Sequence, residues 1–177
     1  LPFREALDDS IQAYRARHGI PGISVVVMQG DEVVYRRGFG WADSVQQKAA
    51  HAGTVYLAAS VSKVIGATLA ARLEQQGVLD LSRPTSDYLD GLPSHHTHTV
   101  EQLLGKIGCT PHYPEGNEPD TDPTYAWRRP ALEQIWDDPL LADCTPGEEY
   151  RYSTHGFTYV GAVLEAVAEK PIADILH

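Results

Sequence analysis

The stretch Leu57-Ala58-Ala59-Ser60-Val61-Ser62-Lys63-Val64-Ile65-Gly66-Ala67 joins the motif Ser-x-x-Lys to the strongest helical pattern in the chain, which continues to Gln76-Gly77. One helical turn brings residues i and i+3 to the same face, so we expect the Lys63 amine beneath the Ser60 hydroxyl. A serine hydroxyl becomes a strong nucleophile when a neighbouring base takes its proton. A lysine amine can be that base where burial or a nearby cation lowers its pKa. The stretch therefore predicts an activated serine beside helical N–H groups that can stabilise an oxyanion.

The same four residues also fit a role without chemistry. Ser60 can cap the helix with its hydroxyl, and Lys63 can be an exposed residue of the first turn. A motif this short does not separate the two interpretations, so the rest of the chain has to decide between them.

Length and composition describe one globular domain with a sizeable core, since the 177 residues are 42% hydrophobic and 21% charged. The formal net charge of -10 argues against nucleic acid or an anionic membrane as the main partner. No apolar run is long enough to cross a bilayer. The location is not fixed by the sequence, although a periplasmic or secreted one is favoured over the cytoplasm. The chain begins at Leu1 without Met, which fits removal of a leader and fits a trimmed start equally well.

The two cysteines, Cys109 and Cys144, leave the redox compartment open, because they can be free thiols or one disulfide. A reactive thiol at Cys109 would need a base beside it, and none is identifiable in the sequence. A small buried residue is the favoured interpretation of Cys109.

Periodicity and turn residues predict a mixture of helices and strands. β-Branched runs on both sides of Gly30-Asp31 indicate an antiparallel hairpin, and the polar stretch after it predicts a loop that reaches Thr54. Thr99 and Gln102 have the spacing of a capping box at the start of a helix. Helices are expected over residues 3–18, 60–77, 99–104, 130–136 and 157–169, and strands over residues 23–28 and 32–37.

Several histidines raise the question of a metal site: His95, His96, His98, His112 and His155. The first three have loop spacing and lack acidic partners in a familiar ligand pattern, so a solvated loop is favoured and no metal is expected. Residues 108–123 are rich in Pro, Gly, Asp and Glu, which predicts a long surface loop of the kind that often carries function.

Read in order, these motifs resemble the serine β-lactamase and penicillin-binding-protein superfamily, most closely its class C-like branch of esterases, D-amino-acid peptidases and LACTB-like serine proteases. The similarity is colinear over nearly the whole chain, and several motifs in order are more specific than any one. The segments that carry it are Ile20-Pro21-Gly22-Ile23-Ser24-Val25, Ala59-Ser60-Val61-Ser62-Lys63, Gln76-Gly77-Val78-Leu79-Asp80-Leu81, Val100-Glu101-Gln102-Leu103-Leu104-Gly105, Asp137-Asp138-Pro139-Leu140-Leu141, Pro146-Gly147 and Tyr150-Arg151-Tyr152-Ser153-Thr154.

The resemblance implies roles for individual residues. Ser60 would be the acylated nucleophile and Lys63 the base beside it. Tyr152 would stand in the family's second motif, Tyr-x-Asn, and relay a proton to the leaving group, which requires a nearby ammonium because a phenol ordinarily titrates near pH 10. Thr154, in the same motif, would contact substrate. His112 resembles the His of the His-Tyr pair in LACTB-like members and would line the pocket, although a surface-loop role fits it equally well.

Three positions depart from the family's pattern. Thr154 stands where the family has Asn, and a hydroxyl cannot offer both a carbonyl acceptor and an amide donor to substrate. Lys106 stands where the family usually has His, and Cys109 where it usually has Gly. A glycine often marks a backbone position with special dihedral angles, so we expect this loop to differ in shape.

The family's third motif, Lys or His followed by Ser/Thr-Gly, does not occur in the chain, and the strands that complete the sheet beside the hairpin are missing. We therefore expect this chain to be one piece of a larger protein, completed by a further segment or a second chain. A hairpin alone is not a stable sheet, so in isolation the chain should expose an apolar sheet edge and be unstable or aggregated. A monodisperse, cooperatively melting monomer would refute this expectation.

The resemblance implies an α+β fold of the β-lactamase/transpeptidase type, an antiparallel sheet flanked by helices together with a mostly helical part. Residues 1–58 would form the N-terminal helix and hairpin, and residues 59–177 the mostly helical part. The implied activity is serine hydrolysis of an amide or ester through an acyl-enzyme on Ser60, with a small acyl, ester or peptide substrate and no metal or organic cofactor. The alternative is an inactive relative used for binding or self-assembly.

Overall fold

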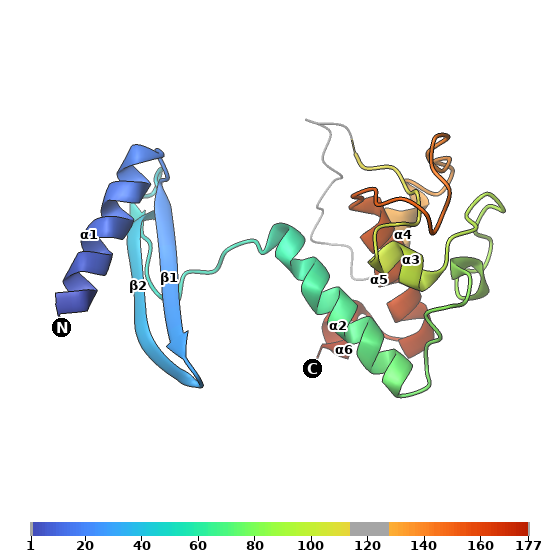
Figure 1. The fold of residues 1–177 in the computed structure, drawn as a ribbon, viewed down its shortest axis with the longest axis horizontal. Coiled ribbons are helices and arrows are strands. Elements are labelled where there is room, and N and C mark those ends of the chain that lie inside the picture. The colour runs from blue at the N-terminus through green and yellow to red at the C-terminus, as the bar shows by residue number, and fades with distance from the viewer. Residues whose placement is uncertain (1, 114–127, 177) are drawn as a thin grey trace. The chain divides into compact units, whose positions relative to one another are not determined.

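The computed structural model describes residues 2–113 and 128–176 (Figure 1). The chain divides into two compact units, Leu1–Leu57 and Ala58–His177. No helix of the described residues is long and apolar enough to cross a membrane. The predicted loop over residues 108–123 lies partly outside the described residues, which end at Tyr113 and resume at Arg128.

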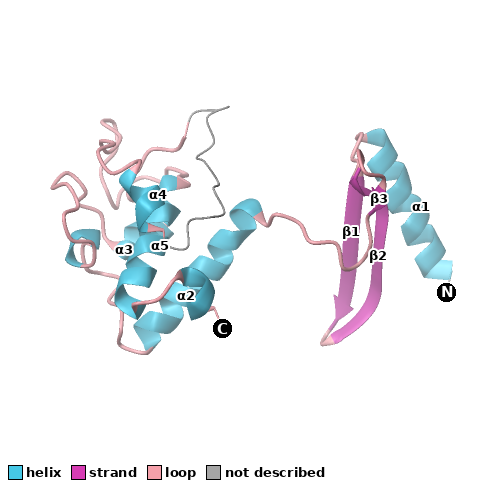
Figure 2. Ribbon diagram, turned by 180° about the vertical axis from the view of Figure 1, so that it is seen from behind, coloured by secondary structure: helices cyan, strands magenta, loops and turns pink. Residues whose placement is uncertain are grey.

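The first unit is a helix packed on a small antiparallel sheet (Figure 2). It contains α1 (Pro2–Arg17), β1 (Gly22–Gln29), β2 (Glu32–Asp43) and β3 (Lys48–Ala49), with the strands in the order β1-β2-β3. Gly30, at φ 59°, supplies the left-handed turn of the β1–β2 hairpin. Asp8 of α1 accepts a hydrogen bond from the Tyr35 hydroxyl of β2 at 2.5 Å and pairs with Arg37 of the same strand. The prediction of a continuous loop from the second strand to Thr54 is wrong at Lys48–Ala49, which form β3. Ala49 pairs with Trp41 of β2 across a short turn.

The second unit is helical and is built around α5 (His155–Ala168). The other helical elements of this unit are η1 (Ala59–Val61), α2 (Ser62–Gln75), η2 (Thr85–Asp87), α3 (Val100–Leu104), α4 (Arg129–Glu133) and α6 (Ile172–Ile175). The buried face of α5, with Tyr159, Val160, Val163 and Leu164, packs in one core with Leu69 and Leu73 of α2 and with Val100 and Leu103 of α3. The predicted capping box of Thr99 and Gln102 is confirmed, with both reciprocal hydrogen bonds formed.

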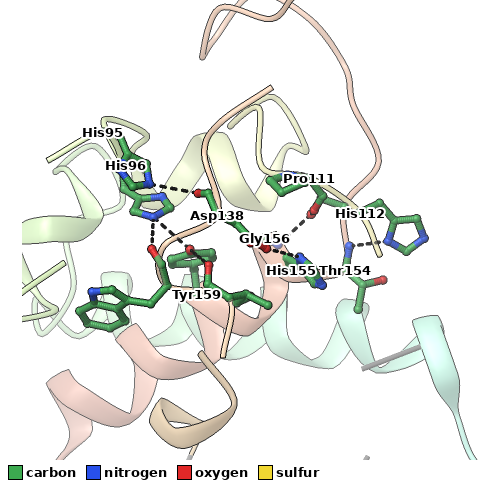
Figure 3. A network of polar contacts seen from close by, with 12 residues as sticks. His95, His96, Pro111, His112, Asp138, Thr154, His155, Gly156 and Tyr159 are labelled. Atoms are coloured by element: carbon green, nitrogen blue, oxygen red, sulfur yellow. Dashed lines mark hydrogen bonds and ion pairs between the residues drawn. The ribbon is translucent and has the colours of Figure 1, made fainter. Parts of the chain in front are cut away.

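Two of the clustered histidines are core residues, so the prediction of a solvated loop is wrong for them. His96 and His98 are 2% and 0% exposed, whereas His95 is exposed. The His96 ring donates a hydrogen bond from Nε2 to the Trp136 carbonyl at 2.9 Å and lies beside the Tyr159 ring (Figure 3). Tyr159 comes from α5, about 60 residues away in sequence, so local polarity could not reveal this burial. Among the described residues, no group of three or more His, Cys, Asp and Glu side chains could hold a metal ion.

The two cysteines form a disulfide, which decides between the two alternatives left by the sequence. The bond joins Cys109, which is 1% exposed, to Cys144 in the segment that leads to Tyr152. Lys106 and Cys109 both have φ 58°, so the position where the family usually has glycine keeps a left-handed backbone in this chain. A free reactive thiol at Cys109 is therefore excluded.

Candidate active site

Ser60 and Lys63 lie one turn apart where η1 continues into α2. The Lys63 Nζ atom donates a hydrogen bond to Ser60 Oγ at 3.1 Å, and Ser60 is exposed. Ser60 is not the capping residue of either helix, because these positions are Ala58 and Val61 and neither makes a side-chain capping bond. The capping interpretation of the motif is therefore wrong, and the serine hydroxyl is directed to other side chains.

The residue before the serine has an unusual backbone conformation. Ala59 has φ 44°, in the left-handed region that costs a residue with a Cβ atom roughly 1 kcal/mol. Such strain persists only where surrounding structure imposes it, and it is common at functional sites. In this chain it sets the direction in which the backbone enters η1 and presents Ser60.

Tyr152 is held by the residues on both sides of it. The Arg151 N–H donates to the Lys106 carbonyl at 2.7 Å. Ser153, which is 3% exposed, donates from its hydroxyl to the Pro111 carbonyl at 2.6 Å and accepts from the Gly156 N–H at 2.9 Å. These bonds fix the backbone of Tyr152 against the segment that follows α3 and against the first turn of α5.

The phenol of Tyr152 reaches the serine. Its oxygen lies 2.6 Å from Ser60 Oγ, a short hydrogen-bond distance for two hydroxyl groups. Hydrogen bonds with Ser60 and Lys63, and then the positive charge of Lys63, lower the pKa of Tyr152 from its ordinary value, while partial burial opposes the shift. Tyr152 is 38% exposed, so the site is open to a substrate. This arrangement favours proton exchange between the phenol and the serine.

Thr154 and His112 complete the set of residues that the sequence singles out. Thr154 Oγ1 accepts a second hydrogen bond from Lys63 Nζ, at 3.3 Å. The Thr154 N–H donates to His112 Nδ1 at 3.3 Å (Figure 3), and the His112 ring meets the Tyr152 ring edge-on. The structure thus brings all five residues into one contact network. The catalytic and substrate-binding roles expected of them remain predictions.

Two residues of the site were not expected from the sequence, Lys106 and Phe157. The Lys106 ammonium lies 5.7 Å from the centroid of the Tyr152 ring and 5.7 Å from that of Phe157. Lys63 lies 5.1 Å and 5.7 Å from the same two centroids. A signal for Phe157 was available, because it follows Thr154 by three residues at a helix start and so shares its face. At Lys106 the sequence shows only a departure from the family's His.

His155 is not part of this contact network. Its side chain is buried, and its Nδ1 atom lies 3.9 Å from Asp138 Oδ2. Burial lowers the pKa of His155, and the nearby Asp138 charge opposes that shift. His155 is the first residue of α5, where burial disfavours the charged form of its imidazole.

The chain matches the family model described as Beta-lactamase over residues 7–177. A putative penicillin-binding protein, PbpX of Bacillus subtilis, is 32% identical over 110 residues, which cover 62% of this chain and 28% of that protein. Penicillin-binding protein 4* of the same organism is 22% identical over 174 residues, 98% of this chain and 38% of that protein. The chain therefore spans well under half the length of both relatives.

Solved structures share the fold at low sequence identity. The octameric penicillin-binding protein homologue from Pyrococcus abyssi has a TM-score of 0.81 at 22% identity, over 97% of this chain and 41% of that one. The D-amino acid amidase from Ochrobactrum anthropi SV3 has a TM-score of 0.74 at 22% identity, over 92% and 44%. EstCE1, described as a hydrolase with promiscuous acyltransferase activity, has a TM-score of 0.73 at 23% identity, over 97% and 50%. The predicted fold class is thereby confirmed.

Proposed function

The chain belongs to the Beta-lactamase family, and on that premise we propose that it carries the nucleophile of a serine hydrolase that transfers an acyl group to water through an acyl-enzyme on Ser60. The observation that carries the proposal is the pair of contacts made by Ser60 Oγ, at 2.6 Å to the Tyr152 hydroxyl and at 3.1 Å to Lys63 Nζ. A nucleophile, a proton acceptor and a group that orients the acceptor are the parts that covalent catalysis needs.

In the acylation step, Ser60 Oγ attacks the carbonyl carbon of an amide or ester, and its proton passes to the Tyr152–Lys63 pair. The new C–O bond forms while the carbonyl electron pair moves onto oxygen, where the backbone N–H groups at the start of the helical segment can stabilise it. When the tetrahedral intermediate collapses, the bond to the leaving group breaks and Tyr152 returns the proton to that group. Water then repeats the sequence on the ester of Ser60 and releases the acid.

Lys63 has a second acceptor in Thr154, and this supports a role for Thr154 in holding the ammonium between Ser60 and Tyr152. A hydroxyl has only one hydrogen to donate, so Thr154 offers a substrate less than the family's usual Asn does. His112 borders the site from the segment that follows α3 and is proposed to contact the acyl group. The substrate class is an amide or ester of the β-lactamase, D-peptidase or esterase type, in keeping with the amidase and the hydrolase that share the fold.

We also propose that a further segment or a second chain completes the sheet of the first unit. Large apolar side chains are exposed on its strands, including Val26 at 58% and Met28 at 56%. This chain aligns with only 28% of PbpX and 38% of penicillin-binding protein 4*, so the remaining parts of those proteins are long enough to contain further strands. The disulfide supports an oxidising location such as the periplasm or the exterior.

The test is covalent labelling of the full-length protein. The protein is incubated with a fluorophosphonate and, separately, with a penicillin, and intact mass and peptide mapping follow. A single adduct on Ser60 that is absent from the Ser60→Ala variant is the expected result. No adduct on folded full-length protein would overturn the hydrolase and favour a binding or assembly role.

A further inference from the structure

Two ammonium groups lie over the same pair of aromatic rings, and only one of them has a role in the proposed reaction. Lys63 contacts Ser60 directly. Lys106 comes from the turn after α3, and its ammonium lies 5.7 Å from the ring centroids of both Tyr152 and Phe157. Among the residues that the structure describes, no carboxylate forms an ion pair with Lys106, so its charge is available to the Tyr152 ring.

The backbone of Lys106 is fixed relative to Tyr152. Its N–H donates to the Leu103 carbonyl at 3.1 Å, and its carbonyl accepts from the Arg151 N–H at 2.7 Å. The residue has φ 58°, a left-handed conformation that is unfavourable for a lysine and is held by these bonds. The half-buried side chain of Lys106 therefore starts from a fixed backbone position. That position is hydrogen-bonded to Arg151, the residue immediately before Tyr152.

We propose that Lys106 is a positioning residue whose ammonium, together with that of Lys63, stabilises the negative charge that develops on the Tyr152 oxygen, an inference that rests on the proposed function. Lys63 hydrogen bonds to Ser60 and so lies in the path of the transferred proton, whereas Lys106 is not bonded to either hydroxyl. Lys106 thus supplies its positive charge from outside the path along which protons move between Ser60, Tyr152 and Lys63. An ammonium over an aromatic face also restrains the ring.

The size of the effect follows from Coulomb's law. The Lys106 ammonium lies 5.7 Å from the centroid of the Tyr152 ring, and a unit charge at that distance, screened by solvent with a dielectric constant of about 80, shifts a pKa by about half a unit. The other charged or titratable groups near Tyr152 remain unchanged when Lys106 is replaced: Lys63 of α2, His112 of the segment after α3, and, in the segment before α5, Arg151 with its partners Asp143 and Glu149.

The first experiment measures the ionisation of Tyr152 directly, without requiring activity. The ultraviolet titration of the full-length protein is compared with that of its Tyr152→Phe variant, and the difference between the two isolates this one phenol. The same comparison, with and without Tyr152→Phe, is made in proteins that carry Lys106→Met or Lys106→Arg. The Met variant is expected to raise the pKa of Tyr152 by about half a unit, and the Arg variant to leave it within a few tenths. Lys106→Gln is the second neutral variant if the Met protein does not fold. Equal values in the lysine, arginine and neutral backgrounds would overturn the proposal.

The second experiment uses the rate at which a fluorophosphonate labels Ser60, as a function of pH. In the Met variant the acidic limb of the profile should move upward by about half a pH unit, which lowers the rate about threefold on that limb. The Arg variant should follow the parent profile, and 1 M salt should shrink the difference between Met and Lys. An Arg variant as impaired as the Met variant would indicate packing instead of charge and would overturn the proposal. Absence of labelling in the parent protein would instead refute the hydrolase, while the titration of Tyr152 would still test Lys106.

Discussion

Acidification from pH 7 to pH 4 is expected to destabilise the helical unit through one buried side chain, His98. The side chain is completely buried, and its Nδ1 atom lies 2.6 Å from the Thr85 hydroxyl oxygen. That hydroxyl has a single hydrogen, which it donates to the His98 carbonyl at 2.7 Å, so the ring must donate from Nδ1. The neutral imidazole therefore carries its proton on Nδ1, and Nε2 is buried with no partner among the described residues.

Protonation would add an N–H at Nε2 in a position that offers it no acceptor. Burial, and then the neighbouring His96, accordingly lower the pKa of His98 from 6.5 to about 4. The unfolded chain binds this proton more readily than the folded one, so the stabilisation is fully present above pH 6.5 and is lost as the pH falls toward 4. A shift of this size corresponds to about 3 kcal/mol between pH 7 and pH 4.

The assay is urea denaturation of the full-length protein at pH 7, 6, 5 and 4, followed through the helical signal, in parallel with a His98→Asn variant. The variant keeps a side-chain donor for Thr85 but does not titrate in this range. The variant should be less stable at pH 7, and its disadvantage should shrink by about 3 kcal/mol by pH 4. Other groups titrate in both proteins, so the difference between the two isolates His98.

Two results would refute the reasoning. One is a stability difference between the parent and His98→Asn that does not depend on pH. The other is an NMR titration in which the His98 ring has an ordinary pKa near 6.5 in the folded protein. Either would mean that the ring is not buried as a neutral Nδ1 donor.

Three other changes have expected outcomes. A methyl group at Gly156 would stand 2.9 Å from the buried Thr110 Oγ1, so Gly156→Ala should lower the free energy of unfolding, followed by thermal denaturation, by about 1–3 kcal/mol. At Gly66 in α2 a methyl group would meet its nearest atom only at 3.8 Å, so Gly66→Ala should be neutral or stabilising. Equal losses at the two glycines would contradict the contact. Reducing the disulfide should lower stability by about 2–4 kcal/mol, read from melting with and without reductant, and an unchanged melting temperature would show that the bond is dispensable. Thr154→Val removes a hydrogen-bond acceptor of Lys63 and should slow the labelling of Ser60 about tenfold, whereas Thr154→Ser keeps the hydroxyl and should preserve the labelling rate. A Val variant that labels at the parent rate would exclude the Thr154 hydroxyl from the site.

The parts of the site that could be predicted are those that depend on spacing within one helix. Lys63 lies beneath Ser60 because residues three apart share a helical face, and the Thr99–Gln102 box forms because both partners lie in one turn. The contact between Ser60 and Tyr152 spans 92 residues, so no local pattern contains it. It was expected only because the order of motifs resembled a known family.

The sequence does not reveal the burial of His96 and His98 for a related reason. Their segment is polar and has loop spacing, and its neighbours in the core come from α5 and from the stretch before Pro139. A polar ring can be buried when each of its hydrogen bonds is met by a distant carbonyl or hydroxyl, and the identity of those partners is a property of the tertiary structure. The sequence does not fix the pairing of Cys109 with Cys144 for the same reason, because the bond joins segments 35 residues apart.

The site depends on one pair of segments more than on any single helix. The segment after α3 is bonded to the segment before α5 at several points: the Lys106 carbonyl to Arg151, the Pro111 carbonyl to Ser153, and the disulfide between Cys109 and Cys144. These connections fix Tyr152, and Lys106 belongs to the same segment pair as one of its anchors. Lys106, which stands where the family usually has His, is therefore held where its charge acts on the Tyr152 phenol. The pairing of these two segments determines the position of its backbone and, through it, the position of its ammonium.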